Sequence, residues 1–234
     1  MIKFRNLKRK REFNGFILAI LLFTLLFVVL FKNIIFTAGL IEFGDFTIPY
    51  TLENYLKNYS SLWNDIGSYS NFQYIPRLIL YGIPLIISKI IVIKIDFIVK
   101  FLALFPILLS FSLMYILSKF LIMRTLEKPK KNFIPPFISS TIYALNPWVV
   151  GETRHFSLIW GYAFLPLIFL LYIKYLDEER EDYKKVFILA LLLSFASATP
   201  HWIMFSFFVL ASWLIFISLE SISKNNIIWV AISK

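Results

Sequence analysis

The sequence lacks cysteine altogether, and only two of its 234 residues are histidine. Without cysteine, disulfide bonds, thiolate metal centres and thiol nucleophiles are excluded. His155, His201 and the scattered carboxylates lie in separate loops and lack the short fixed spacing of a zinc site, so the sequence predicts none. It also contains no Gly-rich phosphate loop, no serine nucleophile elbow and no dinucleotide-binding fingerprint. Enzyme classes that depend on those motifs are therefore excluded.

Charged residues are scarce as well, at 16% of the chain, whereas hydrophobic residues make up 59%. Soluble domains contain roughly 45–50% apolar residues, and the mean hydropathy here is +0.75. These values predict a protein that crosses the membrane several times and is surrounded by membrane lipids. The net charge of +10 does not indicate nucleic-acid binding. The cations gather in the amino-terminal tail and in 119–131 rather than along a stripe interleaved with aromatic residues.

The amino-terminal tail, residues 1–12, precedes an apolar run at 16–36. Against one anion it carries six cations, which are Lys3, Arg5, Lys8, Arg9, Lys10 and Arg11. Cytoplasmic flanks of membrane helices collect Lys and Arg, so this order predicts a cytoplasmic amino terminus and an external first loop at 37–77. The apolar run exceeds the about 7–15 residues of a cleavable signal, which indicates a retained anchor in the cell membrane.

Apolar runs that approach the about 20 residues needed to cross a bilayer recur along the chain. They lie at 16–36, 97–118, 135–150, 158–176 and 203–219. The longer run from Val186 to Glu220 contains Pro200, which disrupts a helix, so it predicts two short helices that meet there. The expected fold class is all-α: a polytopic helical membrane protein with about six spans, forming a single transmembrane domain over 1–234.

The stretch 78–95 is apolar, has isoleucines at helical spacing and contains Lys89 and Lys94. Such a stretch either spans the membrane or lies in its interface. If it spanned, the basic stretch 119–131 would fall outside, against the bias of cytoplasmic loops toward Lys and Arg. We therefore predict an external interfacial helix at 78–95, with 119–131 and 177–185 cytoplasmic.

This topology places several polar residues on the external face. Asp45, with Glu42 nearby, is a general base or metal ligand, a solvated loop carboxylate, or a cap on a helix that starts near Pro49. Arg154 and His155 either contact lipid headgroups or recognise a phosphate. An Arg fork matches phosphate oxygens, and a neighbouring His can share a proton.

Trp148 and His201 complete the predicted external set. Trp148 belongs to the aromatic belt at the membrane boundary or stacks on a sugar. His201 follows Pro200 and either begins a helix or contacts a substrate. The sequence leaves these alternatives open.

Several short motifs together resemble a family of membrane enzymes. After the basic tail and the first apolar run come Gly44-Asp45 with Pro49 and Trp63, Tyr143-Ala144-Leu145-Asn146-Pro147, and Leu165-Pro166-Leu167. Over about residues 10–220, this order is similar to the amino-terminal half of GT-C-type membrane glycosyltransferases. The likeness is greatest to the arabinofuranosyltransferase-like and YfhO-like membrane proteins and their archaeal relatives.

The resemblance implies that the protein transfers a sugar from a polyprenyl-phosphate donor outside the cytoplasm. By position, Asp45 matches the catalytic acidic residue, and Glu42 is a second one. The substrate-binding residues would be Arg154, His155, His201 and Trp148. Whether a divalent metal ion bridges Asp45 and the donor phosphate is left open. GT-C enzymes usually have more spans and an external domain, so an additional membrane subunit or a longer chain is also implied.

Two other functions fit the sequence less closely, namely a transporter or flippase subunit and a non-catalytic structural membrane protein. Transport requires charges or broken helices in the middle of the membrane, and only Pro106 and Pro200 indicate such breaks. The sequence therefore favours an external site over a transport pathway.

Overall fold

The computed structural model describes residues 2–38, 82–83, 86–87, 89–91, 94–125, 133–151, 156–176, 183–196 and 200–225. No strand occurs among these residues. The helices are α1 (Ile2–Phe36), α4 (Ile95–Thr125), α5 (Ile134–Ala144), α6 (Pro147–Gly151), α7 (Phe156–Leu176), α8 (Tyr183–Ala196) and α9 (Pro200–Asn225). The expected all-α class is confirmed.

Three helical segments are long and apolar enough to cross a membrane: Gly15–Phe36, Asp96–Thr125 and Leu158–Leu176. They belong to α1, α4 and α7 and confirm the helices predicted at 16–36, 97–118 and 158–176. A further apolar segment in α9, Ser206–Phe216, is shorter. The chain is therefore a helical membrane protein, whereas the count of six spans stays a prediction.

The span predicted at 135–150 is not one continuous helix. It consists of α5 and α6, separated by Leu145 and Asn146. Pro147 supplies the physical reason, because a proline has no N–H to donate to a helix that continues through it. The 11 residues of α5 cover about 16 Å, roughly half of a bilayer core.

The interruption predicted at Pro200 is confirmed. Helix α8 ends at Ala196, and α9 begins at Pro200. A proline fits the first position of a helix, where its missing N–H would have no partner within the helix. Helix α9 is longer than the apolar run at 203–219 and continues to Asn225.

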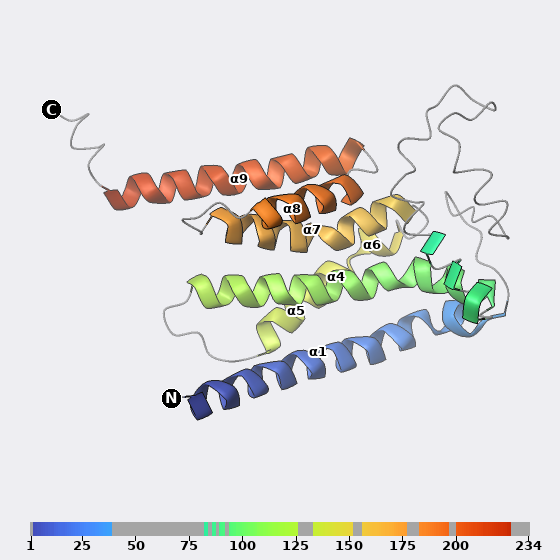
Figure 1. Ribbon diagram of the computed structural model, residues 1–234. Helices are drawn as coiled ribbons and strands as arrows, with labels where there is room; N and C mark the ends of the chain where they lie inside the picture. The colour runs from blue at the N-terminus through green and yellow to red at the C-terminus, as the bar shows by residue number, and fades with distance from the viewer. Residues whose placement is uncertain are drawn as a thin grey trace, which may run out of the picture.

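The helices alternate in direction along the chain (Figure 1). At one end of the bundle, here called the amino-terminal end, α1 begins and α4, α7 and α9 finish. At the other end, here called the distal end, α1 and α8 finish and α4, α7 and α9 begin. Helix α6 lies at this end as well. Helix α4 contacts α1, α5 and α7, and α7 also contacts α8 and α9.

Helix α1 packs one stripe of residues against its neighbours. The stripe consists of residues four apart, namely Ala19, Phe23, Phe27 and Phe31. These residues share a buried cluster with four residues of α4, which are Leu104, Ile107, Phe111 and Tyr115. The rings of Phe23 and Phe111 stack with centroids 3.9 Å apart and planes 9° from parallel. Lipid tails are as apolar as these side chains, so close packing rather than the hydrophobic effect holds such helices together.

Two cations near the amino-terminal end lie over aromatic rings. Arg124 is 5.6 Å from the ring centroid of Trp213, and Lys174 is 5.6 Å from that of Phe120. These contacts join α4 to α9 and α7 to α4. Long cationic side chains can cover apolar rings while their charge stays at the water boundary. The cytoplasmic location of this end stays a prediction from the sequence.

Residues 82–83, 86–87 and 89–91 are helical and lie at the distal end near the start of α4 (Figure 1). Their large apolar side chains are exposed: Ile83, Ile86, Ile87, Ile90 and Ile91. Exposed isoleucines suit either the hydrocarbon layer or its interface. The external interfacial helix at 78–95 therefore stays a prediction.

Cysteine labelling tests the membrane orientation directly, because the natural chain has no cysteine. In intact cells, a membrane-impermeant maleimide is expected to label Ser61→Cys, in the first loop, but not Lys128→Cys. Both positions should react after the cells are lysed. Labelling of Lys128→Cys in intact cells would contradict the predicted orientation.

Candidate functional site

The junction between α5 and α6 contains a polar network built on Asn146. Its side-chain oxygen Oδ1 accepts a hydrogen bond from the backbone N–H of Val149 at 3.0 Å. This bond caps the start of α6, a role that Asn performs well. Its amide nitrogen Nδ2 donates to the Tyr143 carbonyl at 2.8 Å and to the Tyr162 hydroxyl at 3.0 Å. One side chain therefore closes α5, opens α6 and reaches α7.

Tyr143 of α5 and Tyr162 of α7 form a reciprocal pair. Their rings stack with centroids 4.2 Å apart and planes 11° from parallel. The Tyr143 hydroxyl donates to the Tyr162 carbonyl at 2.8 Å, and the Tyr162 hydroxyl donates to the Tyr143 carbonyl at 2.9 Å. The Tyr143 carbonyl, near the end of α5, thus receives two hydrogen bonds. Backbone groups at membrane depth need such partners because lipid supplies none.

Pro166 explains why the Tyr162 carbonyl accepts a side-chain hydrogen bond. In an α-helix this carbonyl would accept from the N–H four residues later. That residue is Pro166, inside α7, and proline has no N–H. The Tyr143 hydroxyl donates to this carbonyl in place of the N–H that Pro166 lacks. The two motif segments 143–147 and 165–167 are therefore linked, although they are about 20 residues apart in the sequence.

Helix α5 is fixed against α4 as well as α7. The Ser139 hydroxyl donates to that of Ser118 at 2.8 Å. The Phe137 ring meets Phe111 edge-on, with centroids 5.8 Å apart. Small polar residues allow membrane helices to approach closely and to bond across the interface. The network at Asn146 therefore rests on a helix held from two sides.

Trp148 lies in α6, next to this network. Its ring centroid is 5.5 Å from that of Tyr162, with planes at 47°, and 43% of the residue is exposed. An exposed indole at the distal end suits both roles predicted for it, the aromatic belt and stacking on a sugar. Trp148 is the predicted site residue whose side chain the structure describes.

The other predicted site residues lie outside the described side chains: Asp45, Glu42, Arg154, His155 and His201. The backbone of His201 belongs to the first turn of α9. In the part of the chain that the structure describes, no group of three or more His, Asp or Glu residues could hold a metal ion. The predicted roles of these residues therefore stay predictions.

The residues that flank the undescribed site segments are nevertheless placed. Segment 39–81 starts after the end of α1 and finishes before residue 82, and segment 152–155 joins α6 to α7. The described residues on either side of these segments, in α1, α6 and α7 and at residue 82, lie at the distal end (Figure 1). The first turn of α9, which contains His201, is at the same end.

Sequence reasoning missed Tyr143 and Tyr162 as members of a site. Asn146 followed by Pro147 is a recognisable helix-start signal. Proline inside the apolar run at 158–176 is a second signal, because it leaves one carbonyl that needs a donor.

No protein-family model, no curated protein and no solved structure matches the chain.

Proposed function

We propose that the protein is a GT-C-like membrane glycosyltransferase that transfers a sugar from a polyprenyl-phosphate donor at the extracytoplasmic face. The observation that carries this proposal is the common location of the flanking residues. The ends of α1 and α6 and the starts of α7 and α9, with residue 82, all lie at the distal end, and these residues flank 39–81 and 152–155 or contain His201 (Figure 1). A base and an anion-binding group from separate loops can then meet over one donor lipid.

In this proposal, Asp45 removes the proton from the acceptor hydroxyl as that oxygen attacks the anomeric carbon of the donor sugar. A new glycosidic bond forms, and the bond between the anomeric carbon and the phosphate oxygen breaks. Polyprenyl phosphate leaves with the electron pair, and Arg154 stabilises its charge. Glu42 and His155 assist at the same surface, and Trp148 stacks on a sugar ring. A divalent metal ion remains an alternative to Arg154 as the anion-binding group.

A transporter or flippase subunit is the second candidate, and the break between α5 and α6 is the feature that bears on it. Transporters bind their substrates where a membrane helix is discontinuous and its backbone groups are free. Here the Tyr143 carbonyl already accepts hydrogen bonds from Asn146 and Tyr162. A carbonyl with two donors is poorly available to an ion, so the break supports a rigid junction better than a transport site.

Reconstituted protein distinguishes these functions. The chain is inserted into liposomes with a polyprenyl-phosphate donor whose pentose or hexose is radiolabelled, together with an extract of envelope acceptors. We expect the label to leave the donor and appear in an acceptor. An EDTA-treated sample tests the metal alternative. Movement of intact donor across the bilayer without loss of its sugar would support the transporter and contradict glycosyl transfer.

A further inference from the structure

Lys100 is a buried cation at the distal end of α4. It is only 9% exposed, and its Nζ donates a hydrogen bond to the carbonyl of Thr37, just beyond the end of α1. Within the described residues, this carbonyl is its partner, and no ion pair compensates its charge. An ammonium group has three donors, so further acceptors are needed. Burying a charge without them is costly in a membrane protein.

Lys100 belongs to the face of α4 that meets α1. It precedes Leu104, Ile107 and Phe111 at intervals of four, three and four residues, which places all four on one side of the helix. The three apolar residues pack in the same cluster as Phe23 and Phe27 of α1. The cation thus lies at the distal end of the seam between the two helices.

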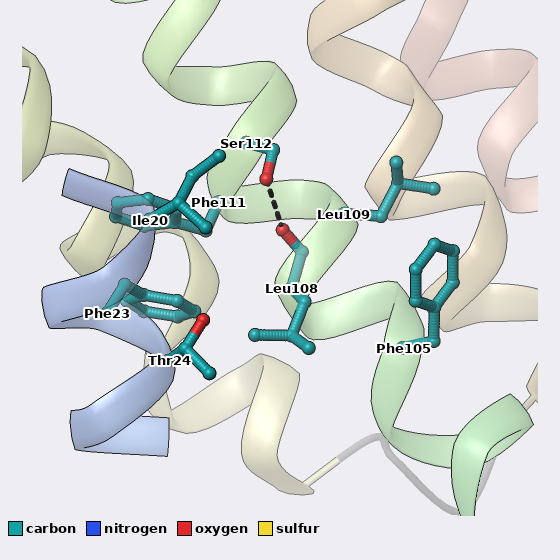
Figure 2. A pocket seen from close by; sticks show the side chains of 8 residues that line it. All are labelled: Ile20, Phe23, Thr24, Phe105, Leu108, Leu109, Phe111 and Ser112. Atoms are coloured by element: carbon teal, nitrogen blue, oxygen red, sulfur yellow. Dashed lines mark hydrogen bonds between the residues drawn. The ribbon is translucent and has the colours of Figure 1, made fainter. Parts of the chain in front are cut away.

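An apolar cavity of about 230 Å³ lies further along the same two helices (Figure 2). Helix α1 contributes Ile20, Phe23 and Thr24, and α4 contributes Phe105, Leu108, Leu109, Phe111 and Ser112. The Ser112 hydroxyl donates to the Leu108 carbonyl at 2.9 Å, so that polar group is satisfied within the helix. Most of these residues are only partly buried. Both helices contain candidate membrane spans, so a bilayer around them would place hydrocarbon beside the cavity.

The spacing between cation and cavity matches a lipid in one leaflet. Along α4, Phe105 is about 7.5 Å and Ser112 about 18 Å from Lys100, at 1.5 Å per residue. One leaflet contributes about 15 Å of hydrocarbon. A phosphate beside Lys100 would therefore allow its chain to run into the cavity, and its oxygens would accept the remaining ammonium hydrogens.

We propose that an anionic glycerophospholipid binds along the α1–α4 seam, with its phosphate at Lys100 and one acyl chain in the cavity. This site does not depend on glycosyl transfer. Charge complementarity selects the occupant, since a zwitterionic lipid offers no net negative charge to the buried ammonium. The lipid would fill the space between two helices and compensate the charge of Lys100.

The test is lipid binding to the delipidated full chain in detergent, measured by native mass spectrometry. Phosphatidylglycerol is expected to bind about tenfold more tightly than phosphatidylcholine, the scale of one charge-assisted hydrogen bond. Lys100→Gln should remove this preference, and Lys100→Arg should keep it. Lys94→Gln is the matched control, because Lys94 is exposed at the same end of the bundle.

A second variant keeps the test informative if Lys100→Gln fails to fold. Leu109→Trp retains the cation but fills the cavity, and it should weaken the binding of both lipids. Equal affinity of the natural chain for the two lipids, or unchanged phosphatidylglycerol binding by Leu109→Trp, would overturn the proposal. Displacement of phosphatidylglycerol by equimolar polyprenyl phosphate would assign the site to a polyprenyl lipid and would also overturn the proposal.

Discussion

Replacing Asp45 by Asn is expected to lower glycosyl transfer by at least about 100-fold, because a positioned general base contributes about 10²–10⁴ to the rate. Asparagine keeps the size of the side chain but cannot accept the acceptor's proton. The measurement is the initial rate at which labelled sugar leaves the polyprenyl-phosphate donor in liposomes. Binding of the donor should change little, because the substitution leaves Arg154 in place.

Asp65→Asn is the matched control, since Asp65 lies in the same predicted external loop. It should transfer sugar at the rate of the natural chain. Both variants should insert and unfold like the natural protein, which separates loss of chemistry from loss of fold. Full activity of Asp45→Asn would reduce Asp45 to a helix cap. An equal loss in both variants would indicate a general need for negative charge in the loop.

The second large effect is expected at the Tyr143–Tyr162 pair. Tyr143→Phe should destabilise the protein by about 1–2 kcal/mol, because the Tyr162 carbonyl then loses its donor and Pro166 cannot replace it. Pro166→Ala restores an N–H at the position that normally bonds this carbonyl. In the Pro166→Ala protein, Tyr143→Phe should lower the free energy of unfolding by clearly less than it does in the natural protein. The double-mutant cycle therefore isolates the role of the proline.

Equilibrium unfolding in mixed micelles measures all four proteins of this cycle. Tyr172→Phe is a suitable control, because it removes a tyrosine hydroxyl from α7, the helix that contains Pro166 and the Tyr162 carbonyl. Tyr172 is partly buried in α7, as Tyr162 is. An identical cost of Tyr143→Phe with and without Pro166 would show that the hydroxyl does not replace the missing helical donor.

The membrane class, three of the helices and two of the breaks follow from local properties of the sequence. Long apolar runs predict α1, α4 and α7, because lipid requires about 20 apolar residues per span and internal backbone hydrogen bonds. Pro200 predicts the boundary between α8 and α9. Pro147 could have predicted the division of 135–150, since a proline at that position ends a helix by the same rule.

Only the tertiary structure decided which faces meet. The hydrogen bond from Lys100 to Thr37 joins residues 63 positions apart, and the tyrosine pair joins residues 19 apart. Hydropathy does not choose such partners in a membrane, because lipid is as apolar as a helix face. The contacting faces are determined by aromatic rings that pack against each other and by donors that reach unpaired carbonyls. Both kinds of contact form only in the complete bundle. Asp45 and Arg154 remain predictions from the sequence, whereas the α1–α4 seam and the network at Asn146 were found only in three dimensions.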